Sequence, residues 1–406
     1  MPKKLNIKKN KKRIEVIKFS KTKSNKYKQF LQITKIIKSF FIILHFLVLY
    51  YLGNKKLIIE KEEILKNGKK YLNKCLEGKL INNYINIKNI NEIKITAIIS
   101  IYNNQKMIKS VIRSIQNQKM KEIEIILVND FSSDNTSKII EKIQKEDPRI
   151  KIINNEKNMG ILYSRSIAVL EAKGKYIITL NPDDLFFNDE IFDIIYNEAE
   201  KGNFDIISFV PVYINYYKST IKEMSFGGVS NISDSLLVKQ PELSYFLFFK
   251  NNSFKLENAQ IWGKLIRSEI YKNAVDLLGQ KRYSKYSIIN EDYISMYAIC
   301  SVANSYKYIN KFGLFHYINI FPDSNEEHRI GMYILFTDVI FDLTKKENKN
   351  LVAIWVLYLY DNITYLGIND RNNFQQILYK IMYCNDIESQ YKKTLKEKLK
   401  GFDLQI

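Results

Sequence analysis

The sequence predicts an α/β fold with a Rossmann-like, mostly parallel sheet flanked by helices. From about residue 93, short apolar runs alternate with helical stretches, which is typical of βαβ units. The 406 residues are 46% hydrophobic and 26% charged, as in ordinary globular proteins. With only 14 Gly, 6 Pro and 3 Cys, the composition excludes a collagen-like chain and a disulfide scaffold.

Each predicted strand is a short apolar run bounded by polar turns. The strands are expected at 95–101, 123–128, 150–153, 175–180 and 205–210. The helices between them are expected at 106–118, 136–145 and 161–172. Further elements are a helix near 291–303, strand-like runs at 305–309 and 315–320, and helices from about 329, including an apolar core helix at 351–360. We therefore expect an α/β domain over 93–325 and a helical C-terminal extension over 326–406.

The positive charge is concentrated at the amino terminus. Net charge is +20, and residues 1–38 alone carry 14 Lys or Arg against one acid, Glu15. Because the charge is confined to the tail and the rest of the chain is only mildly basic, the sequence does not predict a basic binding groove. We therefore expect no specific nucleic acid as a partner. Residues 39–53 have no formally charged side chain. As a helix they would rise about 22 Å, short of a hydrocarbon core of about 30 Å.

We interpret residues 39–53 as a signal-anchor transmembrane helix between a cytosolic tail (1–38) and a stem (54–92). The positive-inside rule then places most of the chain on the lumenal side, so we expect a single-pass type II membrane protein of the Golgi or endoplasmic reticulum. The thinner membranes of the early secretory pathway suit a short span. A cleaved signal peptide and a buried core helix remain alternatives.

Polar residues follow four of the predicted strands. Open α/β sheets bind ligands beyond the carboxyl ends of their strands, so these residues are expected to share one rim. The candidates for binding a ligand are Ser100, Tyr102, Asn103, Asp130, Arg165 and Asp184.

The carboxylates of Asp183 and Asp184 directly follow a predicted buried strand. Such a pair suits a hard divalent cation, Mn²⁺ or Mg²⁺, that shares its ligand shell with phosphate oxygens. The metal would neutralise the charge that grows on a diphosphate leaving group. Because no GxxxxGK[ST] loop and no helix-opening G-x-G-x-x-G occurs, the metal and Arg165 are expected to hold the phosphates.

Four segments in this order resemble the inverting family 2 glycosyltransferases of the GT-A fold. They are ITAIISIYNN, EIILVNDFSSDNT, NMGILYSRS and YIITLNPDDLF. The family's usual forms are S-x-Y-N, V-D-D-G-S-x-D-x-T, N-x-G-x-x-x-A-R-N and L-D-x-D-D. The resemblance covers about residues 93–320. It implies a GT-A fold and transfer of a sugar from a nucleotide-diphosphate donor to a glycan, lipid or protein acceptor.

The resemblance also implies roles for matching residues. Asp130 matches the acid that contacts the nucleotide base, and Arg165 matches a basic residue near the base and diphosphate. Asp183 matches the last acid of the D-x-D metal motif. The Glu291-Asp292 pair resembles the family's E-D pair, whose Asp is the catalytic base.

Two later segments resemble the family as well. WGKLIR at 262–267 is similar to N-K-L-Y-R, and Phe315-His316-Tyr317 is similar to H-Y-R. His316 is therefore a further candidate for binding the metal or the diphosphate. Without the upstream motifs, Glu291-Asp292 alone would read as an acidic helix N-terminus, where the dipole favours the ionised form of Asp292.

The chain departs from the family pattern at four positions. Asn129 and Asn181 stand where acids are usual, Phe131 where Gly is usual, and Ser166 where Asn is usual. Asn181 offers an amide oxygen to a metal but no charge. The alternative function is therefore a catalytically inactive protein of the same fold that binds a nucleotide sugar or acts as a scaffold. The sequence indicates no oligomeric state.

Overall fold

The protein is described from a computed structural model. It describes residues 63, 66–77, 92–217, 220–226, 236–240, 243, 248–250, 253–254, 260–279, 291–318, 326–345, 349–362 and 368–399. The predicted tail and signal anchor lie outside the described residues, as does most of the predicted stem. Among the helices that are described, none combines the length and apolar character needed to cross a membrane. The anchor and the type II location therefore stay predictions.

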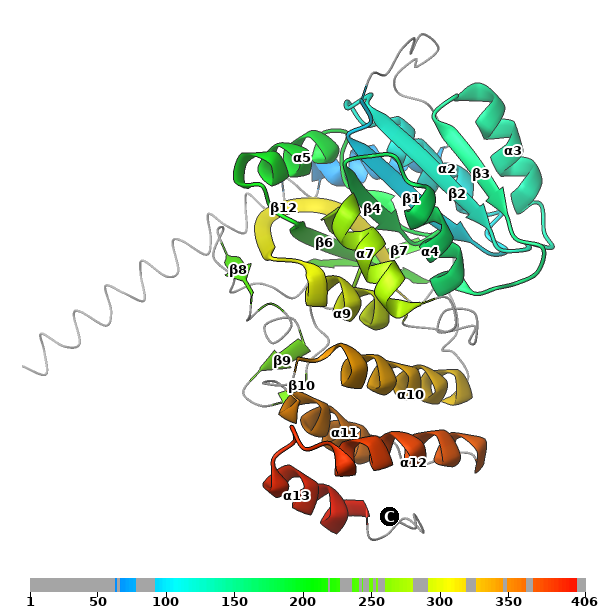
Figure 1. The fold of residues 1–406 in the computed structure, drawn as a ribbon. Coiled ribbons are helices and arrows are strands. Elements are labelled where there is room, and N and C mark those ends of the chain that lie inside the picture. The colour runs from blue at the N-terminus through cyan, green and yellow to red at the C-terminus, as the bar shows by residue number, and fades with distance from the viewer. Residues whose placement is uncertain are drawn as a thin grey trace, which may run out of the picture. The chain divides into compact units, whose positions relative to one another are not determined.

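The chain divides into residues 1–69 and 70–406, and the second unit is built around a large sheet (Figure 1). Within the described residues, the strand order is β3-β2-β1-β4-β11-β6-β12-β5, with β7 paired to β6 and β8 to β12. The bounds are β1 Ile95–Ile101, β2 Ile123–Asn129, β3 Ile150–Asn154, β4 Tyr176–Leu180, β5 Leu185–Phe186, β6 Ile206–Tyr217, β7 Thr220–Phe226, β8 Leu237–Lys239, β11 Lys264–Arg267 and β12 Ser305–Ile318. A second, two-stranded sheet pairs β9 (Phe249–Lys250) with β10 (Ser253–Phe254).

The sheet is mixed, with parallel pairing in its first half. β1 pairs in parallel with β2 and β4, and β2 with β3. β11 runs antiparallel to both β4 and β6, whereas β12 is parallel to β6. One antiparallel strand is thus inserted into an otherwise parallel centre. The carboxyl ends of β1, β2, β3 and β4 consequently lie along one edge.

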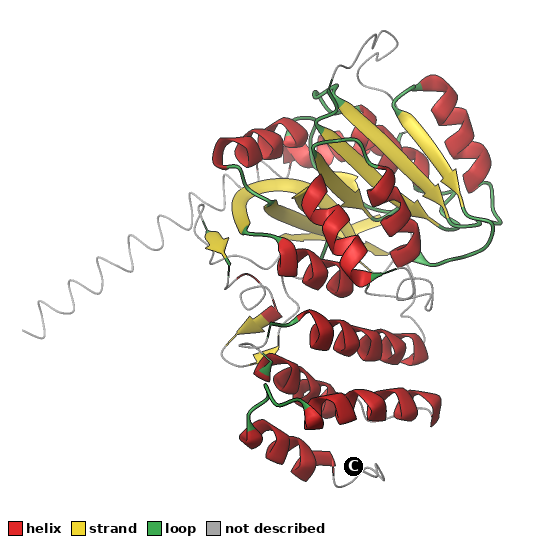
Figure 2. Cartoon of the chain, in the orientation of Figure 1, coloured by secondary structure: helices red, strands yellow, loops and turns green. Residues whose placement is uncertain are grey.

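Alternation along the strands divides the core into two layers. Ile98 of β1 and Ile126 of β2 pack in one cluster with helices α4, α7 and α9. Ile99 and Leu127, one residue further on, pack in the other cluster with α2, α3 and α5. Successive side chains of a strand point to opposite faces, so a strand buried on both faces has no polar stripe. Figure 2 shows the helices on both sides of the sheet. Their bounds are α2 Ile108–Gln116, α3 Thr136–Glu146, α4 Ile161–Glu171, α5 Ile191–Gly202, α7 Ser268–Leu278 and α9 Asp292–Val302.

The predicted strands and helices of residues 93–180 are confirmed, with ends shifted by one or two residues. Helices α5 and α7 and strand β11 were not predicted from the sequence. The runs expected at 305–309 and 315–320 belong to one strand, β12, whose pairing with β6 slips around Phe312. Gly313 lies at this irregularity, where an added Cβ would come within 2.3 Å of the Phe209 ring.

The carboxyl-terminal residues are helical, as expected. The helices are α10 Glu326–Leu343, α11 Asn350–Asn362, α12 Ile368–Tyr383 and α13 Ser389–Leu399. In α11 the apolar run is a core helix, because Val352, Ala353 and Trp355 are fully buried. Trp355 donates its indole N–H to Thr337 of α10 at 2.8 Å. These helices share one hydrophobic cluster with α9, so the extension is packed onto the sheet domain.

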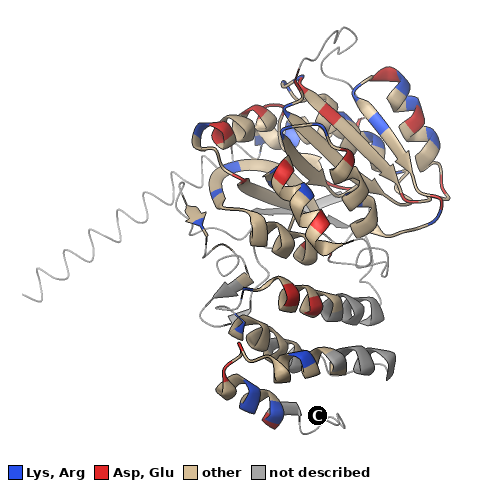
Figure 3. Ribbon diagram, in the orientation of Figure 1, with Lys and Arg blue, Asp and Glu red and all other residues tan. Residues whose placement is uncertain are grey.

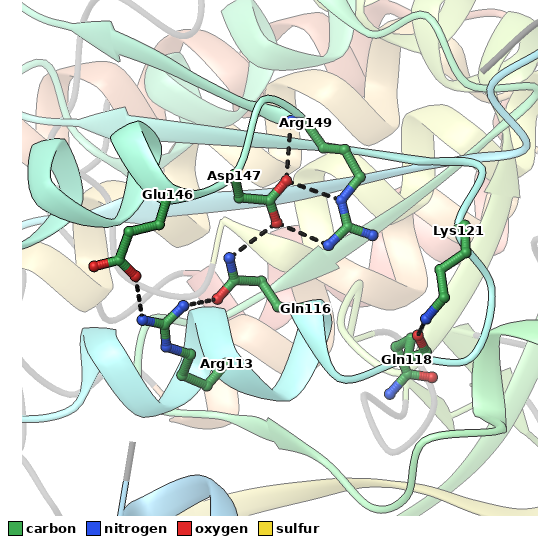
Figure 4. Close-up of polar contacts among 7 residues, drawn as sticks. All are labelled: Arg113, Gln116, Gln118, Lys121, Glu146, Asp147 and Arg149. Carbon is green, nitrogen blue, oxygen red and sulfur yellow. Dashed lines mark hydrogen bonds and ion pairs between the residues drawn. The ribbon is translucent and has the colours of Figure 1, made fainter. Parts of the chain in front are cut away.

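A buried polar network ties α2 and α3 to the start of β3, near the amino ends of the parallel strands (Figure 4). Asp147 accepts a bidentate pair of hydrogen bonds from Arg149, at 3.0 and 2.7 Å, and a third from Gln116 at 2.9 Å. Arg113 bridges Gln116 and Glu146, at 2.6 Å each. Asp147 and Arg149 are only 3% and 2% exposed, so their charges depend on each other rather than on water.

The described surface carries both signs of charge. Figure 3 shows Lys and Arg interspersed with Asp and Glu over the helices and strands. Many are paired, for example Lys94 with Glu122 at 2.7 Å and Lys151 with Glu171 at 2.6 Å. Exposed pairs of this kind contribute little to stability. That the chain has no specific nucleic-acid partner stays a prediction.

Candidate functional site

The polar residues predicted to share a rim do lie at one edge of the sheet. Parallel pairing puts Ile101 opposite Asn129, Asn129 opposite Asn154, and Ile99 opposite Leu180. The segments that follow β1, β2, β3 and β4 therefore leave the sheet side by side. This edge is the one where open α/β sheets bind ligands.

The loops after β1 and β2 are locked together by hydrogen bonds. Asn103, in a left-handed conformation at φ 49°, accepts the backbone N–H of Ser133 at 2.8 Å. Its own backbone N–H donates to the Ser132 hydroxyl at 3.1 Å. Asn104 N–H donates to Thr136 at 2.9 Å. The predicted ligand residue Asn103 thus organises the rim, and Ser100 beside it has a buried hydroxyl without a hydrogen-bond partner.

Asp130 is buried and fully engaged with the loop that precedes α4. One carboxylate oxygen accepts the Asn155 side-chain amide and the Met159 N–H, both at 2.7 Å, and the other accepts the Gly160 N–H at 2.8 Å. These hydrogen bonds fix the loop that leads into α4, which explains why an acid occupies position 130. Contact between Asp130 and a nucleotide base stays a prediction.

Two aromatic side chains stand exposed on the locked loops. Tyr102 is 51% and Phe131 56% exposed. Phe131 has φ 62°, a left-handed conformation that a bulky residue rarely adopts. The resemblance marks this position as one where Gly is usual, and the backbone gives the reason, because Gly adopts positive φ without steric cost. Phe131 therefore keeps the turn at a cost in strain and adds a ring at the rim.

The segment after β4 meets β12. Leu185 and Phe186 of β5 pair with Phe315 and Leu314, and this register brings His316 to the neighbouring Asp184. The His316 Nδ1 and an Asp184 carboxylate oxygen are 2.8 Å apart. Asp184 is fully buried, and its other oxygen has no hydrogen-bond partner.

Aromatic rings hold His316 in place. The Trp262 ring stacks on the imidazole with centroids 4.2 Å apart, and Tyr213 meets it edge-on at 5.7 Å. Burial lowers the pKa of His316, but the Asp184 carboxylate outweighs this effect and the net shift is upward. Burial, and secondarily the charge of Asp184, raises the pKa of Asp183 to about 7, while His316 opposes that rise.

These residues suit a metal only in part. In the described part of the chain, no group of three or more His, Cys, Asp and Glu side chains is arranged to hold a metal ion. Half-buried Asp183 and the orphan oxygen of Asp184 are nevertheless oxygen donors without competing partners. Ions such as Mg²⁺ are often bound by one or two carboxylates and completed by substrate phosphates, a requirement that this site meets.

The predicted catalytic pair begins α9 and is held from α4. The Arg165 guanidinium contacts Glu291 through a very short hydrogen bond, and Asp292 at 3.0 Å, from the same nitrogen. Arg165 and Glu291 are 3% and 5% exposed, whereas Asp292 is 14% exposed. The Asp292 charge also contributes to the raised pKa of His316, so both groups lie in one electrostatic neighbourhood.

The sequence analysis missed several residues of this neighbourhood. Tyr271 of α7 and Lys264 of β11 are buried close enough for Asp292 to act on them electrostatically. Asn155 had not been singled out either. The KLIR segment was noted through the resemblance, but Tyr271 lies in an ordinary amphipathic helix, and no local pattern marks it.

Comparison with known proteins identifies the domain. A family model described as "Glycosyl transferase family 2" matches residues 96–273. Residues 96–273 are a family 2 glycosyltransferase domain. The predicted family is thus confirmed, and the carboxyl ends of β1 to β4 described above lie within this domain.

The relatives extend the match beyond the family model. The family 2 domain and its surroundings are 28% identical over 227 residues to the cholesterol galactosyltransferase of Borreliella burgdorferi, covering 55% of this chain and 60% of that one. They are 25% identical over 217 residues to the GalNAc(5)-diNAcBac-PP-undecaprenol beta-1,3-glucosyltransferase of Campylobacter jejuni, covering 50% and 67%. The chain thus spans less than two thirds of the first of these relatives.

The family 2 domain also has a solved structural neighbour. The crystal structure of S. aureus TarS 1-349 in complex with UDP superposes with a TM-score of 0.52, covering 75% of this chain and 86% of TarS at 16% sequence identity. At this identity the likeness concerns the fold alone. It agrees with the GT-A fold expected from the sequence, with a sheet that is mixed.

Proposed function

We propose that this protein transfers a sugar from a nucleotide-diphosphate donor to an acceptor hydroxyl, with inversion at the anomeric carbon. The observation that carries the proposal is the position of Asp292. Beyond the end of the matched family 2 residues, this carboxylate is the more exposed member of the Arg165-Glu291-Asp292 group, and it lies in the same electrostatic neighbourhood as Asp183, Asp184 and His316.

The residues divide the reaction between two sides of the site. Asp292 accepts the proton of the acceptor hydroxyl as that oxygen attacks the anomeric carbon, and the bond to the diphosphate breaks on the opposite face. The nucleotide lies over the rim formed by the loops after β1 and β2, with Asp130 at the base. Asp183, with His316 and the amide oxygen of Asn181, would hold a divalent cation. That cation would supply positive charge to the departing diphosphate.

We further propose a lipid or lipid-linked acceptor. Two relatives are named for acceptors with a lipid part, cholesterol and a PP-undecaprenol-linked glycan. The basic segment 1–38 and the uncharged run 39–53 suit a location at a membrane, where such acceptors reside. Glycan or protein acceptors, and a Golgi or endoplasmic reticulum location, remain expectations from the sequence alone.

A donor screen tests the proposal. We expect one class of UDP-, GDP- or CMP-sugar to raise the thermal midpoint of the full chain with Mn²⁺ present. At a ligand concentration of 100 times Kd, binding adds about 2.7 kcal/mol of stability. The same donor should then be consumed when lipid acceptors are added. A donor that binds without turnover in any acceptor screen would instead support the inactive binding protein, which the uncharged Asn181 favours.

Metal binding should strengthen as the pH rises through about 7. Because the pKa of Asp183 is raised to about 7, its carboxyl is largely protonated at pH 6, and a metal must displace that proton. For one proton, the apparent Mn²⁺ affinity should rise about tenfold between pH 6 and 8. Calorimetry with the donor sugar bound measures it. Asp183→Asn should remove this pH dependence together with most of the affinity, and a wild-type affinity independent of pH would exclude Asp183 as a ligand.

A further inference from the structure

The Arg165 side chain is paired with two acids and does not face a donor. Its guanidinium is 3% exposed and contacts Glu291 and Asp292, which lie 126 and 127 residues further along the chain. Both contacts are made by one guanidinium nitrogen, and the group as a whole is buried. A buried acid that loses its cation is strongly disfavoured. The geometry therefore assigns this cation to the carboxylates.

Residues of three helices form the group. Arg165 comes from α4, Glu291 and Asp292 from the start of α9, and Tyr271 from α7. The Tyr271 hydroxyl is buried without a hydrogen-bond partner, and the charges of Arg165, Glu291 and Asp292 all act on it. Two further titratable groups face Asp292 electrostatically. They are Lys264 of β11, whose ammonium donates to the Gln260 carbonyl, and His316 of β12.

The two acids are not equivalent. Burial raises the pKa of Glu291 to about 8, with Arg165 opposing and Asp292 adding to the rise. Burial thus disfavours the charged form of Glu291, although its carboxylate contacts Arg165. Different environments that separate two neighbouring acids are the usual means of dividing roles between them. Asp292, at 14% exposure, is also the acid that an acceptor can reach.

We propose that Arg165 and Glu291 are positioning residues that hold the Asp292 carboxylate in one orientation, and that neither contacts the donor. This inference rests on the proposed function, in which Asp292 is the base. It replaces the donor-binding role that the resemblance implied for Arg165 with a role inside the acid group.

Variants of both residues test the inference, once the donor is known. Arg165→Gln should lower kcat about 100-fold, because a misplaced catalytic group costs about that much. Donor affinity, measured by calorimetry, should change less than about twofold. In Arg165→Lys an ammonium replaces the planar guanidinium, so its kcat should lie between those of the wild type and Arg165→Gln.

Glu291→Gln is the conservative variant for the neutral acid. A glutamine accepts from Arg165 through its oxygen and donates to Asp292 through its amide, as a protonated Glu291 does. It should therefore keep kcat within about threefold, whereas Glu291→Leu should lose activity as Arg165→Gln does. Arg113→Gln is the matched control. It also removes a buried bridging arginine, but it should leave kcat within about twofold of the wild-type value.

The outcomes separate this inference from the proposed function. If Arg165→Gln weakens donor binding tenfold or more while kcat stays within about threefold of the wild-type value, Arg165 is a donor ligand and the inference is overturned. If Glu291→Gln loses activity as fully as Glu291→Leu, the neutral role of Glu291 is overturned. If the wild-type protein binds no donor and has no turnover, the proposed function itself fails. Should Arg165→Gln not fold, Arg165→Lys carries the same comparison of kcat and donor affinity.

Discussion

Replacing Asp292 by Asn lowers the kcat of sugar transfer by about 10²–10⁴-fold, the range that a general base contributes. The amide has nearly the shape of the carboxylate, so the contact with Arg165 at 3.0 Å can persist. What is lost is the ability to accept the acceptor's proton. Donor binding, measured by calorimetry, should stay within about twofold of the wild-type value. The rate is measured as product formed from a labelled donor.

The matched control is Asp276→Asn, the same change at an exposed position of α7. It should transfer sugar at the wild-type rate. If Asp292→Asn keeps full transfer activity with a confirmed acceptor, Asp292 is not the base. Equal losses in both variants would point to a general effect of the charge change.

Removing the Asp147 carboxylate destabilises the fold by about 3–5 kcal/mol, the cost of leaving a buried partner charge uncompensated. In Asp147→Ala, Arg149 keeps a cation that is 2% exposed and loses both bonds to its partner. Gln116 loses its acceptor as well, so the polar contacts that connect α2 and α3 to the start of β3 are lost. Urea unfolding midpoints measure the loss. The edge proposed to bind the donor lies at the other ends of these strands, so donor affinity of the folded variant should not change.

The same pair predicts how stability depends on acid. Burial would raise the pKa of Asp147, but Arg149 and Gln116 outweigh it and the pKa lies below its ordinary value of 3.8. A lowered pKa means that the stabilisation is fully present above about pH 4 and is lost as pH falls further. Asp147→Asn should therefore lose less stability on acidification than the wild type does.

Two controls separate the buried pair from charge in general. Glu171→Gln, in an exposed pair with Lys151, should change stability little. The double variant Asp147→Leu with Arg149→Met should recover part of the loss, since a buried pair can often be replaced by apolar side chains. A single variant as stable as the wild type would show that the pair contributes nothing.

Local pattern made the first half of the fold predictable. The strands from Ile95 to Leu180 are short, mostly apolar runs with turn residues at both ends, and β1, β2 and β4 are buried throughout. The elements that were not predicted differ from these strands in length or in pattern. β11 is four residues long, too short to show a period, and the amphipathic stretches of α5 and α7 were not recognised between long connections.

The candidate site was also only partly predictable from the sequence. Asp130, Asp183 and Asp292 could be chosen from the sequence because each directly follows a strand or opens a helix. The partners of these acids could not. Asp184 meets His316 through the antiparallel pairing of β5 with β12, and that pairing is decided 130 residues later in the chain.

By itself the sequence determined the order of the strands along the chain, the polar residues at their carboxyl ends and the family to which residues 96–273 belong. Tertiary structure alone decided that the Arg165 cation is buried against Glu291 and Asp292, and that Phe131 stands in a left-handed turn. Hydrophobic periodicity reports which faces of an element are buried, but it does not report which distant element covers them. Charges that neutralise one another across more than a hundred residues are therefore found only where the chain is folded.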